Sequence, residues 1–342
     1  MRRLIFLPTT HHFPYKNHST LLCPSVSKKG PRWAHMTTTT TAAAGTRRNK
    51  KIVVILGATG SGKSKLSVDL ASRFFTSSEI INSDKIQVYN GLDITTNKIP
   101  LHERENVPHH LLGEFHPSNS HPDFTPSDYR SHCAATISKI LSRQHIPIIA
   151  GGSNSFIYAL LAEKFSPEID VFSESDSINS VICKQVRYNC CFVWVDVSLP
   201  VLNQYLVKRV DDMLDSGMFE ELADYFNDPD SDSVSQSGLK NAIGIPEFAR
   251  YFNRFKNKAV TELENRLAYE EAVKAVKDNT CQLAKRQLGK ILRLRDAAGW
   301  DLKRIDATAA FTAKLAGKRV EDIWEREVVE PSVKIVKRFL ME

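Results

Sequence analysis

Residues 57–64 carry the pattern G-x-x-x-x-G-K-S, which is typical of a loop that binds phosphate groups. The loop consists of Gly57, Ala58, Thr59, Gly60, Ser61, Gly62, Lys63 and Ser64. An apolar run at residues 52–56 precedes it and a helical pattern at residues 63–75 follows it. The glycines let successive N–H groups turn toward one anion, and the helix start adds the positive end of its dipole. We therefore predict a strand, loop and helix that bind a di- or triphosphate.

Two side chains of the loop have more specific predicted roles. Lys63 is expected to bring a mobile positive charge to the terminal phosphates. The Ser64 hydroxyl is placed to hold Mg²⁺, which prefers oxygen ligands. A phosphate and magnesium site is therefore expected at the start of the helix.

The first half of the chain alternates short apolar segments with helical patterns. Buried strands are predicted at residues 52–56, 78–83, 147–150 and 191–197, and helices at residues 63–75, 128–144 and 153–163. This alternation favours an α/β fold like that of P-loop NTPases, with a parallel sheet and helices on both faces. Ligands are then expected at the carboxyl ends of the strands.

The second half of the chain is predicted to be mostly helical. Residues 200–226 show helical spacing, residues 260–298 a long helix, and residues 304–311 a last strand. The predicted parts are a disordered leader at 1–51, a P-loop core at 52–199, a smaller helical lobe at 200–258, and a final part at 259–342 in which the long helix returns to the core.

The positive charge of the chain is concentrated in its first residues. The net charge is +7, but residues 1–51 contain ten Lys or Arg and no acidic residue. The remainder has 36 basic and 39 acidic side chains, so it lacks the basic excess typical of nucleic-acid binding. No apolar run reaches 18 residues, so we expect no membrane span. The six cysteines form no C-x-x-C pair, which favours a reducing compartment without structural disulfides.

The leader itself is rich in Arg, Lys, Ser, Thr and His and has a low-complexity run at residues 37–41. Such a composition is typical of a disordered segment, and it resembles an organelle transit peptide. We expect import into plastids, with mitochondria as the alternative. A plain basic tail stays open, and a start at Met36 would give a cytosolic form.

Polar residues follow the predicted strands where a ligand site is expected. Asp84 comes directly after the second strand. Its carboxylate could act as a catalytic base, bind Mg²⁺ through water, or cap the next helix. Ser153 and Asn154 follow the third strand, either as helix caps or as contacts to substrate. His109 and His110 are adjacent, without a third ligand at a suitable spacing, which favours a structural or substrate-lining role over metal binding.

The order and sequence of these motifs resemble those of the isopentenyltransferase family, whose members transfer a dimethylallyl group to the N6 amine of adenine. The matching segments are NSDKIQVYNGLDITTNKI at residues 82–99, GGSNSF at 151–156, CCFVWVDV at 190–197 and AIGIPEF at 242–248. They are similar to the plant adenylate branch, which makes a cytokinin precursor, more than to the branch that modifies tRNA.

The resemblance implies a division of roles among the candidate residues. Asp84 accepts the proton of the N6 amine, and Thr59 hydrogen-bonds Asp84 or the amine. The loop and Mg²⁺ receive the diphosphate of dimethylallyl diphosphate. ADP or ATP, more than AMP, is the implied acceptor, and its phosphates lie opposite the loop. The basic candidates for those phosphates are Lys240, Lys277, Arg286 and Lys290, each of which is otherwise read as part of a solvated basic face. A monomer is the default expectation.

Three other classes share part of this pattern. A tRNA dimethylallyltransferase performs the same chemistry, but the acidic body and the lack of a Cys/His zinc-finger pattern argue against it. A small-molecule P-loop kinase shares only the loop and the sheet. A non-catalytic nucleotide switch does not require the remaining boxes.

Overall fold

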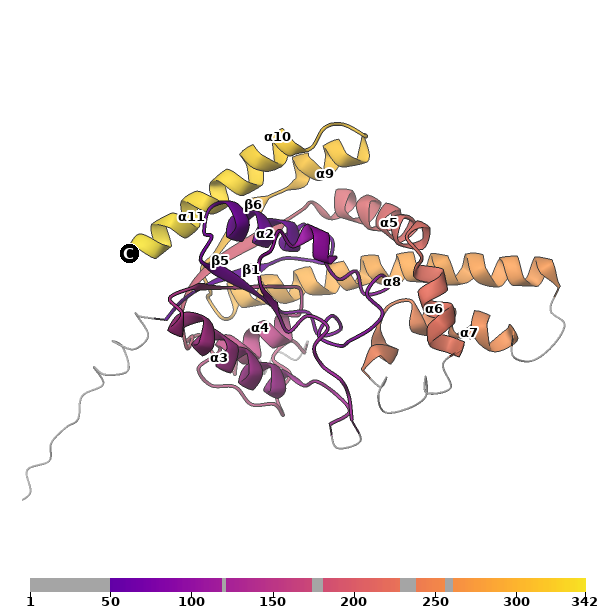
Figure 1. Ribbon diagram of the computed structural model, residues 1–342, viewed down its shortest axis with the longest axis horizontal. Helices are drawn as coiled ribbons and strands as arrows, with labels where there is room; N and C mark the ends of the chain where they lie inside the picture. The colour runs from indigo at the N-terminus through magenta and orange to yellow at the C-terminus, as the bar shows by residue number, and fades with distance from the viewer. Residues whose placement is uncertain (1–49, 119–120, 174–180, 228–237, 256–260) are drawn as a thin grey trace, which may run out of the picture. The chain divides into compact units, whose positions relative to one another are not determined.

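The computed structural model describes residues 50–118, 121–173, 181–227, 238–255 and 261–342. Within them, a six-stranded sheet has the order β3-β2-β4-β1-β5-β6, and every neighbouring pair is parallel (Figure 1). The strands are β1 (Lys51–Leu56), β2 (Ser78–Asn82), β3 (His109–His110), β4 (Ile146–Gly151), β5 (Asn189–Asp196) and β6 (Leu302–Asp306). The predicted α/β class with a parallel sheet is confirmed.

Helices form the rest of the regular structure. They are α2 (Lys63–Arg73), α3 (Pro126–Ser142), α4 (Asn154–Leu161), α5 (Leu199–Asp215), α6 (Met218–Asn227), α7 (Ile245–Phe255), α8 (Glu262–Asp296), α9 (Thr308–Leu315), α10 (Glu321–Trp324) and α11 (Glu330–Met341). Two short 3-10 helices are η1 (Leu101–Glu103) and η4 (Leu239–Asn241), and the π-helix η5 (Glu325–Val329) joins α10 to α11. Among the described residues, no helix combines the length and apolar character needed to cross a membrane.

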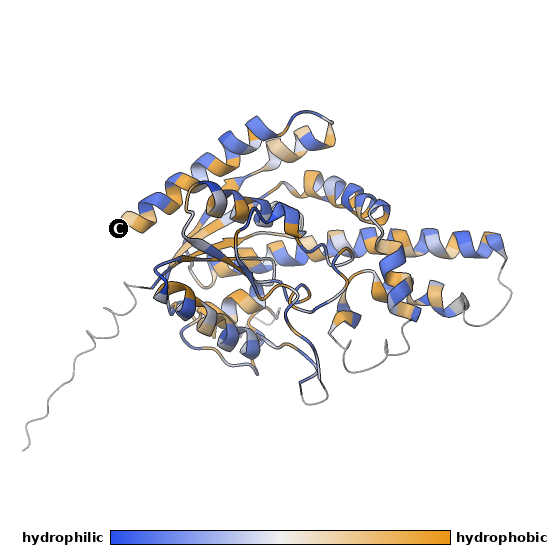
Figure 2. Cartoon of the chain, in the orientation of Figure 1, coloured by the Kyte–Doolittle hydropathy of each residue, from blue (hydrophilic) through white to orange (hydrophobic). Residues whose placement is uncertain are grey.

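The central strand β1 shows how the two faces of the sheet are buried. Ile52, Val54 and Leu56 point into one core, which α3, α4 and α8 cover. Val53 and Ile55 point into the other core, which contains side chains of α2, α9 and α11. All five side chains are fully buried, and burying one such side chain contributes about 1.5–3 kcal/mol. In Figure 2 the covering helices carry both orange and blue residues, as expected for elements with one buried face.

Two helices begin with reciprocal caps that explain where they start. Thr125 and Asp128 form a capping box at the start of α3, and Pro126 occupies its first turn. Thr261 and Glu264 form the same arrangement at the start of α8. The long helix predicted at residues 260–298 is therefore present with nearly the expected limits.

The end of the chain differs from the expectation. A strand was predicted at residues 304–311, but β6 ends at Asp306 and α9 begins at Thr308. The Asp306 carboxylate accepts a hydrogen bond from the Thr308 backbone N–H at 2.9 Å, which favours a helix start over a longer strand. Helices α9, α10 and α11 then pack on the same face of the sheet as α2.

The predicted lobe at residues 200–258 is helical where it is described, and it packs on α8. Aromatic rings join α6, α7 and α8, with Phe219 stacked 5.4 Å from Phe252 and edge-on 5.4 Å from Tyr269. Contacts group the described residues into a single unit. Except for residues 50 and 51, the predicted leader lies outside the described residues, and Lys51 already belongs to β1.

Candidate functional site

A cavity of about 1220 Å³ opens at the carboxyl ends of β1, β2 and β4. The loop after β1 and Asp84 after β2 both line it, as expected for a parallel sheet. Other parts of its lining include Ala150, Gly151 and Gly152 of β4 and the residue after it, Tyr205 and Arg209 of α5, Gln287 of α8, and Phe311, Lys314 and Trp324 of α9 and α10. One cavity therefore joins residues from both halves of the chain.

The backbone of the phosphate loop explains two of its glycines. Gly60 and Gly62 have φ angles of 77° and 92°, a region that side-chain-bearing residues rarely adopt. A Cβ atom at Gly62 would also lie 2.6 Å from the Trp324 ring. The sequence pattern thus encodes a turn that α10 packs against directly.

Lys63 lies buried within the loop it belongs to. Its ammonium donates a hydrogen bond of 2.6 Å to the Ala58 carbonyl oxygen. Burial lowers the pKa of Lys63 to about 8, the charge of Asp84 opposes this shift, and the charge of Arg209 adds to it. An anion bound here would stabilise the protonated form.

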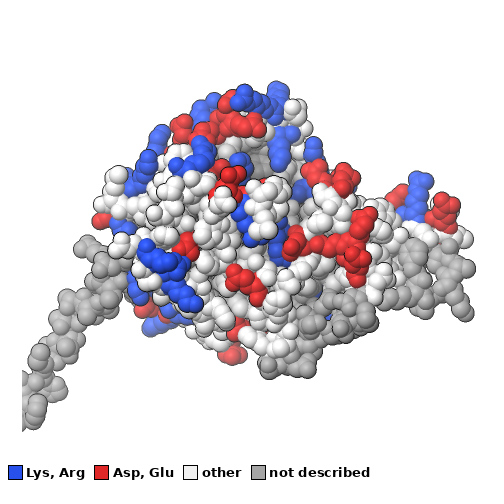
Figure 3. All heavy atoms as spheres, in the orientation of Figure 1, with Lys and Arg blue, Asp and Glu red and all other residues white. Residues whose placement is uncertain are grey.

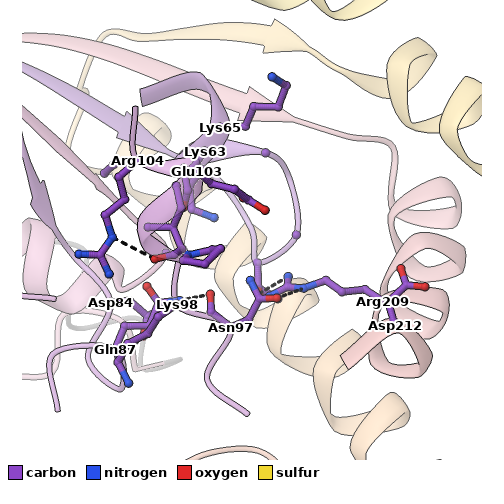
Figure 4. Close-up of a pocket in the computed structure, with 18 of the residues that line it drawn as sticks. Lys63, Lys65, Asp84, Gln87, Asn97, Lys98, Glu103, Arg104, Arg209 and Asp212 are labelled. Atoms are coloured by element: carbon purple, nitrogen blue, oxygen red, sulfur yellow. Dashed lines mark hydrogen bonds between the residues drawn. The ribbon is translucent and has the colours of Figure 1, made fainter. Parts of the chain in front are cut away.

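Thr59 is held from two helices. Its backbone N–H donates to Gln287 Oε1 at 2.6 Å, and its hydroxyl oxygen lies 3.5 Å from Arg209 Nη1. Arg209 Nε also donates to Asn97 Oδ1 at 3.2 Å, and Figure 4 shows the Arg209 side chain extending from α5 toward Asn97. Burial lowers the pKa of Arg209, which is partly opposed by the charges of Tyr205 and Asp84. This half-buried guanidinium is a further candidate to hold an anion.

Asp84 is partly buried at the tip of β2. Its Oδ1 accepts hydrogen bonds from the backbone N–H groups of Ile86 at 3.0 Å and Gln87 at 3.3 Å. The carboxylate therefore caps the turn that follows the strand, while the side chain also lines the cavity. These contacts orient it without requiring a helix at this point.

Ser153 and Asn154 do not line this cavity. The Ser153 hydroxyl oxygen accepts a hydrogen bond from the Lys85 backbone N–H at 2.9 Å, and no side-chain bond from it caps α4. Asn154 is buried and its Nδ2 donates to the Gln287 backbone carbonyl oxygen at 3.2 Å. Both residues fasten neighbouring segments of the site to each other.

The four basic residues expected near the nucleotide phosphates lie outside this cavity. Lys240 is exposed in η4, and Arg286 is exposed on α8. Lys277 pairs with Asp211 at 2.5 Å in a smaller hollow between α5 and α8, and Lys290 lies 5.2 Å from the centre of the Phe172 ring. Because adjacent helical residues point about 100° apart, Gln287 faces the loop and Arg286 does not.

Sequence reasoning missed Gln287 and Arg209 as members of the site. Gln287 follows Arg286 in a segment where only basic side chains were considered, and Arg209 lies in the amphipathic pattern of α5. A polar residue on the buried face of a helix was the available signal in both cases.

The two adjacent histidines have protein partners. His110 Nε2 lies 2.7 Å from Glu79 Oε2, and His109 Nδ1 lies 2.8 Å from the Val107 carbonyl oxygen. Within the described ranges, no group of three or more His, Cys, Asp or Glu side chains could hold a metal ion. Figure 3 shows basic and acidic side chains interspersed over the face in view, with no continuous basic surface among the described residues on it.

A parallel sheet with a phosphate loop and an acidic strand tip in one cavity defines a P-loop enzyme fold. The sequence model of the IPP transferase family matches residues 87–179 and 168–289. An adenylate isopentenyltransferase of Humulus lupulus is 53% identical, over 84% of this chain and 90% of its own. The chain therefore belongs to the IPP transferase family and is a prenyltransferase, as the resemblance predicted.

Other relatives carry organelle names. Adenylate isopentenyltransferase 6, chloroplastic, of Arabidopsis thaliana is 49% identical over 96% of this chain and 97% of its own. Adenylate isopentenyltransferase 7, mitochondrial, of the same plant is 42% identical over 83% and 79%. Among solved structures, a eukaryotic dimethylallyltransferase acting on tRNA matches with a TM-score of 0.64 and 23% identity over 85% of this chain and 79% of that chain, which shows the shared fold.

Proposed function

We propose that this protein transfers a dimethylallyl group from dimethylallyl diphosphate to the N6 amine of ADP or ATP, with AMP less favoured. Diphosphate is released, and the product is the precursor of isopentenyladenine-type cytokinins. The relatives named adenylate isopentenyltransferase support this acceptor class. The supporting structural observation is that an anion-binding loop and the Asp84 carboxylate line the same cavity.

The reaction has two chemical requirements that this cavity can meet. The adenine amine is a weak nucleophile because its lone pair is delocalised into the ring, so its proton needs an acceptor. The N6–carbon bond forms as the carbon–oxygen bond to diphosphate breaks, and Asp84 takes the N6 proton. Hydrogen bonds from the backbone of Ile86 and Gln87 hold this carboxylate in place.

The leaving diphosphate requires compensation of its growing negative charge. The loop amides, Lys63 and the half-buried Arg209 supply positive potential to this cavity. Thr59 lies between these groups and Gln287, so its hydroxyl is positioned by contacts from α5 and α8. We assign Thr59 to orient the reacting groups.

Magnesium fits the oxygen donors at this site. Ser64 is exposed at the first turn of α2 and lines the cavity, and Asp84 supplies a carboxylate to the same cavity. Mg²⁺ typically keeps several waters and binds through one or two protein oxygens plus substrate phosphates. When bound, the ion would neutralise part of the diphosphate charge, with Ser64 as its direct protein ligand.

The position of the acceptor's phosphates is a separate proposal. Lys240, Lys277, Arg286 and Lys290 keep their predicted role for a nucleotide that extends beyond the cavity. Lys98 and Lys314 are basic side chains that line the cavity itself. Lys98 is paired with Asp93 at 2.9 Å, whereas Lys314 lies against the Tyr205 ring. Lys314 is therefore the better placed of these two to meet added negative charge.

One assay tests the function. Purified protein is incubated with labelled dimethylallyl diphosphate, Mg²⁺, and AMP, ADP, ATP or unmodified tRNA as the acceptor. We expect labelled ADP and ATP products and little product with tRNA. Labelled tRNA alone would favour the tRNA-modifying alternative, and γ-phosphate transfer from ATP without prenylation would favour a kinase.

We also propose that residues 1–51 direct the protein to plastids, which the chloroplastic relative supports. The mitochondrial relative makes mitochondria the alternative. A fusion of residues 1–51 to a fluorescent protein should accumulate in plastids of plant cells. Mitochondrial or diffuse cytosolic fluorescence would contradict the proposal.

A further inference from the structure

The contact between Gln287 and the phosphate loop is unusual for a loop that binds anions. Such a loop works because its backbone N–H groups point at the anion. Here the N–H of Thr59 already donates to Gln287 Oε1 at 2.6 Å, across 228 positions of the sequence. Gln287 is a buried polar residue, with 7% of its surface exposed, and it lines the cavity.

The surrounding structure fixes the Gln287 side chain. A Cβ atom at Gly152 would lie 2.6 Å from Gln287 Nε2, so the carboxamide passes directly over this glycine. Asn154 Nδ2 donates to the Gln287 backbone carbonyl oxygen at 3.2 Å, which ties this turn of α8 to the turn after β4. The backbone of Gln287 is therefore fixed by Asn154, and its carboxamide lies between Gly152 and the Thr59 N–H.

Thr59 lies toward the end of the loop that is distant from α2. A phosphate on the start of α2 meets the N–H groups of residues 62–64 first, and a longer polyphosphate extends toward the earlier residues of the loop. The Thr59 N–H already donates to Gln287, so it is not available to bind a third phosphate. That phosphate would instead face the side-chain carbonyl oxygen of Gln287. The negative end of that dipole repels phosphate oxygens.

We infer that Gln287 limits the phosphate loop to an anion of two phosphates and so excludes the triphosphate of ATP from the donor position. This inference rests on the proposed function, in which the donor carries a diphosphate and an acceptor can carry a triphosphate. Without such a limit, ATP would compete with the donor for the loop. Gln287 is thus a specificity-determining residue, and Gly152 provides the space that its side chain needs.

The test measures binding of two inorganic anions, pyrophosphate and triphosphate, by calorimetry in Mg²⁺ buffer. The unmodified protein should bind pyrophosphate at least about tenfold more tightly. Gln287→Met has a similar length but no carbonyl oxygen, and it should reduce this ratio about tenfold, or about 1.4 kcal/mol, by improving triphosphate binding. Gln282→Met, at an exposed position on α8, is the matched control and should leave the ratio unchanged.

A second variant approaches the same contact from the other side. Gly152→Ala places a methyl group where the Gln287 amide lies, so it should shift the ratio in the same direction. A folded Gln287→Met or Gly152→Ala protein with an unchanged ratio overturns the inference. Because the measurement needs no turnover, a shifted ratio without any prenylated product supports the role of Gln287 and refutes the proposed function. If the ratio is unchanged in a protein that forms the prenylated product, the role of Gln287 is refuted and the proposed function is supported.

Discussion

The Lys63 ammonium donates a 2.6 Å hydrogen bond to the Ala58 carbonyl oxygen, so the loop's own lysine closes across the loop. Both partners are buried, and the arrangement removes the ammonium from water. A bound diphosphate would offer this ammonium a stronger, negatively charged acceptor. The affinity of the loop for diphosphate should therefore depend on whether Lys63 is protonated.

The first prediction concerns the pH dependence of diphosphate binding. Burial lowers the pKa of Lys63 to about 8, so its positive charge is present below that pH and is lost as pH rises through it. Affinity for pyrophosphate should therefore fall above about pH 8 relative to a Lys63→Arg variant, because arginine stays charged. Calorimetry on both proteins from pH 7 to 9 tests this, and titration of the ligand itself cancels in the comparison. A constant affinity ratio would contradict the charge argument.

The second prediction concerns Asp84. Asp84→Asn keeps an oxygen that can accept the hydrogen bonds of Ile86 and Gln87, but it cannot accept the N6 proton at neutral pH. Turnover should fall by about 10²–10⁴-fold, while pyrophosphate affinity changes little. Asp322→Asn, at a position outside the cavity lining, is the matched control. Near-normal turnover of Asp84→Asn would remove this residue as the base.

The sequence predicts the local structure of this site but not the contacts between segments that are distant in the chain. The phosphate loop and the strand tip at Asp84 were predictable because glycine spacing and short apolar runs are local patterns. The contacts of Thr59 with Arg209 and Gln287 were not, because they join residues 150 and 228 positions apart. Strand β3 has only two residues, His109 and His110, which is too short to produce a periodic pattern.

The third prediction concerns acid stability and uses Glu79, near the amino end of β2. Burial acts to raise the pKa of Glu79, but hydrogen bonds from Arg143, His110 and His145 outweigh it and lower the pKa below its ordinary value. The stabilisation is thus present above the unfolded-state pKa and is lost as pH falls through the folded-state pKa. Glu79→Gln should cost about 1.5–3 kcal/mol at pH 7 and much less in acid. Urea unfolding at several pH values measures this, and an equal loss at all of them would refute it.

The fourth prediction concerns Trp324, which brings the C-terminal part of the chain to the phosphate loop. A Cβ atom at Gly62 would lie 2.6 Å from its ring, and its Nε1 donates to Asp69 Oδ2 at 2.8 Å. Trp324→Ala leaves a void beside the loop and should cost about 3–5 kcal/mol of stability, together with weaker pyrophosphate binding. Asp69→Ala removes the acceptor of the hydrogen bond and keeps the whole Trp324 ring against Gly62, so it should cost about 1 kcal/mol and retain binding. Urea unfolding and calorimetry on both variants separate the two contributions. If Asp69→Ala binds pyrophosphate as poorly as Trp324→Ala, the bond to Asp69 controls the loop, and packing of the ring against Gly62 does not.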